Sequence, residues 1–229
     1  MSRLILDAEE EAFVFENEWD TVIPLSFTHT PADDTVVTAF PQIEEVAHRF
    51  LDRFEDDPTS DEALAYLFEA LAPFMKKWGY HDDRFRDRWG YILRAEAGQT
   101  VGHAQHAAVL LTAADEDDNE TTYDLEATCE AGCLAYGIRE NGKVVSLAVT
   151  HEAPEEGDAV IEVGVETVPA ARGRGYATAC LVALAKELLR RGIAVEYRCQ
   201  RYNEASHRVA LAAGLRETGK YYYYVGRKD

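Results

Sequence analysis

Residues 159–214 read AVIEVGVETVPAARGRGYATACLVALAKELLRRGIAVEYRCQRYNEASHRVALAAG. The patterns run in the order alternating strand, loop with two glycines and two arginines, helix, second apolar strand, and helix beginning at an asparagine. Gly173 and Gly175 let successive backbone N–H groups point into one concavity at the start of the first helix, where the helix dipole favours an anion. Arg172 and Arg174 add positive charge beside it. The stretch therefore predicts a cradle for a pyrophosphate group.

The strand expected over 159–168 places two carboxylates on one face. Glu162, Gly164 and Glu166 alternate with apolar residues, and successive residues of a strand point to opposite faces. A sheet covered by helices on both faces would not normally bury two carboxylates. This face is therefore expected to line a wet cleft or to be open to solvent, and the neighbouring cradle favours the cleft.

Charge is distributed unevenly along the chain. The 42 acidic and 23 basic residues give a net charge of −19, which argues against nucleic acids and membranes as partners. Residues 172–229, in contrast, contain 12 basic and 5 acidic residues. A bound polyanion would explain this basic segment, and the alternative is an ordinary cationic helix face.

Cysteine usage and hydropathy indicate the compartment. The chain has four cysteines, no apolar N-terminal run beyond Leu4–Leu6, and no apolar segment of membrane-spanning length. We therefore expect a soluble, cytoplasmic protein without a disulfide framework.

The first 105 residues are expected to form a small, mostly helical module. Residues 1–40 read as irregular or short-strand material. An apolar stripe over 43–54 predicts one helix, a capping box of Thr59 and Glu62 begins a second, and apolar residues at 85, 89, 92 and 93 predict a third. The aromatic residues of this module are read as core, with a binding surface as the alternative.

The second half begins with a predicted hairpin. Asn141-Gly142 between two apolar runs is typical of a type I′ turn, so 133–138 and 144–150 should pair as antiparallel strands. With the strand at 159–168 and the helices after it, this indicates an α/β (α+β) domain over 106–229. Its sheet should be mixed, mainly antiparallel and flanked by helices.

A dinucleotide-binding fold is the main competitor. It also uses a strand, a glycine loop, a helix and a second strand, and Glu196 lies at a suitable spacing for a ribose contact. However, the third glycine position of G-x-G-x-x-G is Thr178, and only 33 residues follow Glu196. The remaining chain is too short for a doubly wound sheet.

Arg172-x-x-Gly175-x-Ala177 between a strand and a helix, followed by Asn203-Glu204-Ala205-Ser206 and then Ala213-Gly214-Leu215, resembles the GNAT superfamily of acyl-CoA-dependent N-acetyltransferases. The loop matches the R/Q-x-x-G-x-G/A signature of that family, and the Asn-x-x-Ser helix matches its later motif. The likeness extends over about 106–229 and is best over 159–215. It leaves the first hundred residues unexplained.

The resemblance implies that acetyl-CoA is the cosubstrate. In such a site the backbone of the strand end pairs with the pantetheine arm, the loop amides hold the pyrophosphate, and Asn203 and Ser206 lie beside the cofactor. For Asn203 and Ser206 the alternative is pure helix capping. The implied cofactor-binding residues are Val165, Thr167, Val168, Arg172, Gly173, Arg174, Gly175, Tyr176, Ala177, Asn203 and Ser206.

The resemblance also implies direct attack of a neutral amine on the thioester. This reaction needs a base, an N–H group for the oxyanion and a proton for the thiolate. Glu162 and Glu166 resemble the strand carboxylates that act as the base, with plain surface charge as the alternative. Many family members carry a Tyr that acts as general acid to the thiolate, at the position where this chain has Ala210. The nearest substitutes are Tyr176 and the run 221–224, in which Tyr221, on the same face of a final strand as Tyr223, is the candidate acid, with strand packing as the alternative.

Two pairs have metal-like spacing but no second pair beside them. They are His103 with His106 and Cys129 with Cys133, and we expect no metal site at either. His151, at a strand end, is read as a surface residue and is kept as a second candidate base.

Together these patterns predict an acetyl-CoA-dependent N-acetyltransferase over 106–229, preceded by a helical module over 1–105. The expected partner is a small-molecule or peptide amine, and the net charge favours a cationic one such as a polyamine, an aminoglycoside or a Lys-bearing peptide. The module is expected to shape the acceptor site or the interface of a homodimer. The alternative, suggested by Ala210, is an acyl-CoA sensor that binds the cofactor without catalysis.

Overall fold

The computed structural model describes residues 2–17, 20–30, 34–82 and 89–228. It divides into two compact units, the first made of Met1–Tyr91 with Thr218–Asp229 and the second of Ile92–Glu217. The chain passes between the units within two strands, β6 (Trp89–Ala95) and β12 (Arg216–Tyr223). These boundaries differ from the division at residue 105 expected from the sequence, because the end of the chain returns to the first unit.

The first unit combines strands and helices. In its main sheet, β1 pairs with β4 in parallel, β4 with β3 antiparallel, and β3 with β12 antiparallel. A smaller sheet has the order β2-β13-β5. The bounds are β1 Ser2–Leu6, α1 Ala8–Glu16, β2 Thr21–Val22, β3 Leu25–His29, β4 Thr35–Ala39, η1 Pro41–Ile43, α2 Glu44–Arg53, α3 Asp61–Trp78, β5 His81–Asp82 and β13 Gly226–Arg227.

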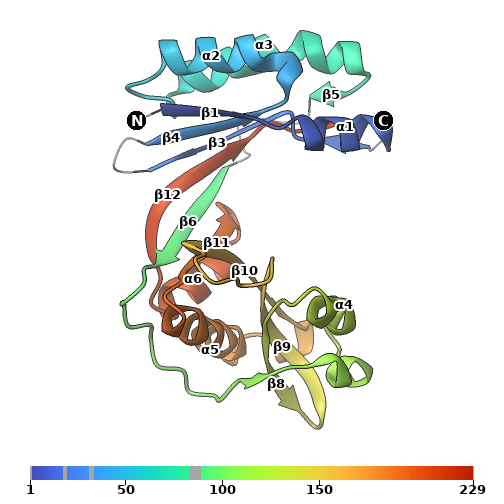
Figure 1. Cartoon of the computed structure of the whole chain (residues 1–229), viewed down its shortest axis with the longest axis vertical. Helices are drawn as coiled ribbons and strands as arrows, with labels where there is room; N and C mark the ends of the chain where they lie inside the picture. Colours follow the sequence, from blue (N-terminus) through green and yellow to red (C-terminus); the bar gives the residue numbers. More distant parts are fainter. Residues whose placement is uncertain (1, 18–19, 31–33, 83–88, 229) are drawn as a thin grey trace. The chain divides into compact units, whose positions relative to one another are not determined.

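The two longest helices of this unit cover one face of its main sheet (Figure 1). The predicted stripe forms α2, which buries Ala47 and Phe50, and the second predicted helix forms α3. The cap of α3 is Ser60, whose side chain accepts a hydrogen bond from the Ala63 N–H, and not the predicted Thr59. Phe27 stacks on Tyr222 with ring centroids 4.7 Å apart, which joins β12 to this core.

The structure decides one open alternative in the first unit and corrects one expectation. Residues 1–40, expected to be irregular or short-strand material, contain the short strands β1 to β4 and the unexpected helix α1. The third predicted helix is instead strand β6, while position 85 lies outside the described residues. Trp89, Tyr91 and Ile92 are residue types that favour strands, and burial largely alternates along β6. The helical period that matched them was therefore coincidental.

The second unit has the predicted mixed, mainly antiparallel sheet. Its strands lie in the order β11-β10-β9-β8-β7, in which β10 and β11 pair in parallel and the other described neighbours pair antiparallel. This order differs from that of a doubly wound dinucleotide fold. The bounds are β7 Val109–Leu110, η3 Ala113–Asp118, α4 Leu125–Glu130, β8 Ala135–Glu140, β9 Lys143–Thr150, β10 Val160–Thr167, η4 Pro169–Ala171, α5 Tyr176–Arg190, β11 Ala194–Gln200 and α6 Glu204–Ala212.

The hairpin and the central helix follow from local sequence. Asn141 and Gly142 have φ values of 52° and 87°, which a type I′ turn requires, and they join β8 to β9 as predicted. Helix α5 buries an almost continuous apolar face, including Leu181, Leu184 and Leu188, against β8, β9 and β10. No helix in the described ranges is long and apolar enough to cross a lipid bilayer.

Candidate functional site

Strands β10 and β11 separate part of the way along their length. Their pairing runs from Val160 with Ala194 to Glu162 with Glu196, whereas β10 stays paired with β9 as far as Thr167. Alternate residues of β10 direct their backbone groups to β9, as the bond from the His151 N–H to the Glu162 carbonyl shows. The backbone of Val165 therefore faces the gap that opens beside β11, and no described strand pairs with that edge.

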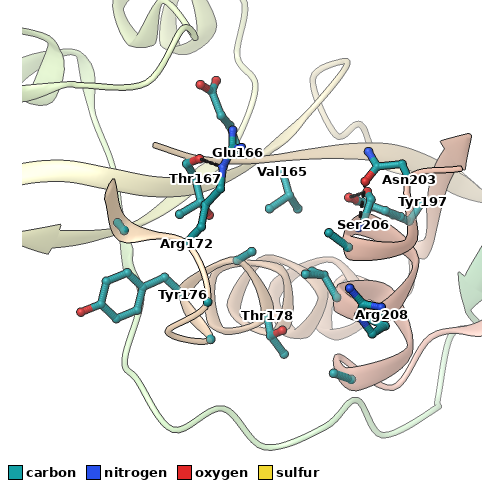
Figure 2. Close-up of a pocket in the computed structure, with 17 residues that line it drawn as sticks. Val165, Glu166, Thr167, Arg172, Tyr176, Thr178, Tyr197, Asn203, Ser206 and Arg208 are labelled. Carbon is teal, nitrogen blue, oxygen red and sulfur yellow. Dashed lines mark hydrogen bonds between the residues drawn. The ribbon is translucent and has the colours of Figure 1, made fainter. Parts of the chain in front are cut away.

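A pocket of about 580 Å³ occupies this part of the second unit. Val165 points toward α5, and Asn203, Ser206 and Tyr197 lie across the gap (Figure 2). The pocket is lined by Val165, Glu166, Thr167, Ala171, Arg172, Gly173, Gly175, Tyr176, Ala177, Thr178, Tyr197, Asn203, Ala205, Ser206, Arg208, Val209 and Ala212.

The start of α5 forms the anion-binding side of the pocket. Gly173 and Gly175 have φ values of 77° and 80°, and Gly175 is the N-cap residue. Among the described residues no side chain caps this helix, and no acidic residue stands in its first turn. The first N–H groups of a helix need partners from outside it, so they are left available to a ligand. We call residues 172–177 the cradle.

The two cradle arginines are held differently. Arg172 lines the pocket, and its Nε donates to the Thr167 carbonyl at 3.0 Å. Arg174 is absent from the pocket lining. Its guanidinium pairs with Glu140 and donates to the Ala170 carbonyl at 3.1 Å. Arg172 therefore supplies positive charge to the pocket, while much of the charge of Arg174 is compensated elsewhere.

Helix α6 supplies the opposite wall. The Asn203 side chain accepts a hydrogen bond from the Ser206 N–H at 3.1 Å, so it caps α6, and both residues also line the pocket. The Tyr197 hydroxyl lies 2.5 Å from the Ser206 hydroxyl. Burial raises the pKa of Tyr197, which keeps its hydroxyl protonated near neutral pH.

Nine of the eleven residues expected to bind the cofactor lie around this one pocket, and Val168 and Arg174 do not. Their role in binding stays a prediction. The sequence interpretation missed the inner face of α6, where Ala205, Arg208, Val209 and Ala212 line the pocket. The signal was present, since these positions follow the spacing i, i+3, i+4, i+7 from the Asn203 cap.

The three candidate catalytic residues have different surroundings. Glu166 lines the pocket, but its carboxylate points away from α5 and accepts bonds from the Thr122 N–H at 3.0 Å and hydroxyl at 2.7 Å (Figure 2). Glu162 is absent from the pocket lining and pairs with Arg198 and His151. Tyr221 belongs to the first unit, where its ring stacks on Tyr223. Their catalytic roles stay predictions.

A comparison with known protein families finds one match in the second half of the chain. Residues 120–224 match the family model described as GNAT acetyltransferase. No curated protein matches the sequence.

Solved structures with a similar fold include three acetyltransferase-like proteins. A putative GNAT-family acetyltransferase from Novosphingobium aromaticivorans is 21% identical, with 66% of this chain and 68% of that chain covered and a TM-score of 0.48. A GCN5-related N-acetyltransferase-like protein from Streptococcus suis is 16% identical, with coverage of 89% and 88% and a TM-score of 0.49. A GCN5-related N-acetyltransferase from Kribbella flavida is 16% identical, with coverage of 97% and 94% and a TM-score of 0.48.

Proposed function

Because this chain is a member of the GNAT superfamily, and so an acyltransferase by family, we propose that it transfers an acetyl group from acetyl-CoA to the primary amine of an acceptor. The proposal rests on two features that occur together in one pocket. An uncapped helix start next to Arg172 suits a pyrophosphate, and the open edge of β10 suits an extended arm that contains amides.

These features assign the parts of the cosubstrate. The pyrophosphate would bind the N–H groups of the cradle and Arg172. The pantetheine arm would lie along the gap and exchange hydrogen bonds with the backbone of Val165. Asn203 and Ser206 would contact the arm from α6, which leaves the thioester near the point where β10 and β11 separate.

The reaction is a direct displacement. The neutral amine attacks the thioester carbonyl, a C–N bond forms, and the C–S bond breaks with its electron pair going to sulfur. The amine loses one proton to a base before attack and a second one on collapse of the tetrahedral intermediate, and the thiolate takes up a proton. An N–H group of β10 would stabilise the oxyanion. The base must lie on the face of β10 that carries Glu162, Gly164 and Glu166.

The acceptor class follows from charge. The chain's net charge of −19 favours a cationic amine over an anionic acceptor. A polyamine, an aminoglycoside and a Lys-bearing peptide all meet this condition. A cytoplasmic location and a homodimer remain part of the same proposal.

One observation favours a second candidate. Ala210 is fully buried in α6, so that position offers no proton donor for the thiolate. If no other group replaces it, the domain would bind acyl-CoA as a sensor. The thiol of CoA is acidic enough to leave without a dedicated acid, which makes this candidate the weaker of the two.

Thiol release by the full chain tests the proposal. Acetyl-CoA is supplied with a panel of spermidine, an aminoglycoside, a Lys-bearing peptide and an uncharged amine, and the free thiol is measured with a chromogenic disulfide. We expect release above background hydrolysis with at least one cationic amine. Tight acetyl-CoA binding without turnover on any amine would favour the sensor, and failure to bind would contradict both candidates.

A further inference from the structure

The face of β10 opposite the pocket carries a second group of polar side chains at Gly164. A Cβ atom at position 164 would lie 2.4 Å from the Tyr123 hydroxyl and 2.8 Å from His151 Nε2. Two polar atoms from distant segments therefore meet over the one position of β10 that has no side chain. We call Tyr123, His151, Glu162 and Gly164 the Gly164 cluster.

His151 is oriented by a carboxylate. Its Nδ1 lies 3.7 Å from Glu162 Oε1, at ion-pair distance, while Nε2 is the nitrogen that lies over Gly164. A carboxylate beside Nδ1 favours the tautomer with its proton on that nitrogen, which leaves a lone pair on Nε2. The imidazole is about half exposed, with 48% of its side-chain surface accessible, so a solute can reach it.

Glu162 is itself held in place. Arg198 Nε lies 3.3 Å from Glu162 Oε2 and 2.6 Å from the carboxylate of Glu196. Glu196 is buried and also pairs with Arg94. This alternation of two arginines and two carboxylates balances charge and fixes Glu162 toward His151.

Tyr123 adds a neutral donor at the same place. Burial, and then the charge of Glu166, raises the pKa of Tyr123, so its phenol stays protonated near neutral pH. An imidazole lone pair beside a phenol proton can accept from and donate to one amine nitrogen. The cluster therefore offers one hydrogen-bond acceptor and one donor, which complement the N–H group and the lone pair of an acceptor amine.

The cluster lies next to the expected thioester. Gly164 directly precedes Val165, whose backbone faces the gap beside β11 and which lines the pocket. The pocket and the Gly164 cluster therefore adjoin consecutive residues of β10. A thioester bound beside Val165 would lie one residue along β10 from the Gly164 cluster.

We propose that His151 is the general base of the transfer reaction and that Glu162 is the residue that positions it. The inference rests on the proposed function. Nε2 takes a proton from the acceptor ammonium, which gives the neutral amine and an imidazolium beside the Glu162 carboxylate. The amine then attacks and the C–N bond forms. As the C–S bond breaks with its electron pair going to sulfur, the nitrogen loses its second proton and the thiolate takes up a proton, and the imidazolium returns its proton to solvent. Glu166 is less suited, because its carboxylate already accepts two hydrogen bonds from Thr122.

The test compares His151→Gln with a matched control, His48→Gln. His48 is an exposed histidine in the first unit whose Nε2 lies 3.6 Å from Glu44, a similar ion pair without a role in the site. With the best amine of the panel, His151→Gln should lower kcat about 100-fold and leave the acetyl-CoA Kd unchanged. The acidic limb of the wild-type kcat/KM profile should disappear in this variant. His48→Gln should retain both kcat and the limb.

Two further variants separate catalysis from structure. Imidazole in the buffer should partly restore kcat in His151→Ala, which a structural role would not allow. Glu162→Gln should move the acidic limb to lower pH, because the imidazolium loses its carboxylate partner. An unchanged limb in His151→Gln, or its loss in Glu166→Gln instead, would overturn the assignment while the wild type still turns over. A wild type without turnover would overturn the proposed function itself.

Discussion

The cradle and the Gly164 cluster both belong to the second unit, but they are built from different kinds of chemical group. The cradle takes six consecutive residues and presents backbone N–H groups and one arginine that lines the pocket. The cluster takes titratable side chains from segments around residues 123, 151 and 162. Backbone donors suit a group of constant charge, whereas proton transfer needs side chains that change charge. Substitutions in the cradle should therefore change affinity, and those in the cluster should change turnover.

The largest effect is expected from Gly175→Asp in the cradle. A carboxylate at the N-cap of α5 would occupy the anion site and repel the pyrophosphate, so acetyl-CoA affinity should fall about 100-fold. Isothermal titration calorimetry measures this Kd directly. Gly142→Asp is the matched control, since Gly142 has a similar φ of 87° in the β8–β9 turn, away from the pocket. Equal losses in both variants would show that backbone strain, and not the cradle, sets the affinity.

Gly164→Ala should break the cluster without removing a polar group. The added methyl would overlap the Tyr123 hydroxyl and His151 Nε2, which must move aside. Since both contacts are side-chain ends, the fold should tolerate the change, but the misplaced base should lower kcat about 30-fold. Stopped-flow or steady-state thiol release gives kcat, and calorimetry should give the wild-type Kd for acetyl-CoA. A raised Kd with normal kcat would place Gly164 in the cofactor site instead.

The two arginines of the cradle allow a finer comparison, because replacement by Gln removes one positive charge at either position. Arg172→Gln should weaken acetyl-CoA binding about 10-fold, because Arg172 lines the pocket. Arg174→Gln should weaken it only about 2-fold, because its guanidinium is engaged by Glu140 and Ala170. Titrations at low and high salt should show a smaller salt dependence for Arg172→Gln than for wild type. The opposite ranking would contradict the geometry of the cradle.

The smallest effect concerns the far end of α5. Hydrogen bonds from Arg190, and then from Arg191, lower the pKa of Glu187 to about 2. A lowered carboxyl pKa stabilises the fold above the unfolded-state pKa of about 4.5 and loses that contribution as pH falls toward 2. Glu187→Gln should therefore cost about 1 kcal/mol at pH 7, after allowance for the exposed arginines, and nothing near pH 2.

Thermal unfolding across this pH range measures the difference. Because Glu187 lies outside both the cradle and the cluster, acetyl-CoA Kd and kcat should stay at wild-type values. A change in either at constant fold would show that α5 transmits stability to the site.

The sequence was sufficient for most of the second unit because the relevant signals are local. The Asn141-Gly142 turn, the alternation along β10, the paired glycines before α5 and the Asn203 cap each depend on residues a few positions apart. The predicted hairpin, strands and helices are all present. The same locality explains why most predicted cofactor residues surround one pocket.

The rest depends on contacts between distant segments. His151 was ranked as a surface residue, because no periodicity connects it with Tyr123 or Gly164. Strand β6 was taken for a helix, since the adjacent apolar residues Ile92 and Leu93 interrupt the alternation of a strand and fit a helical spacing from Trp89. Short strands in residues 1–40 gain their stability from partners far along the chain, such as β12 with β3, which no local pattern contains.

Equilibrium titration of the wild-type chain with acetyl-CoA, repeated in the presence of excess NADH, tests the central claim most directly. We predict saturable acetyl-CoA binding that NADH does not displace, and its loss in Gly175→Asp. Binding of NADH in preference to acetyl-CoA, or full affinity for acetyl-CoA in Gly175→Asp, would contradict the assignment of the pocket between β10, α5 and α6 as an acyl-CoA site.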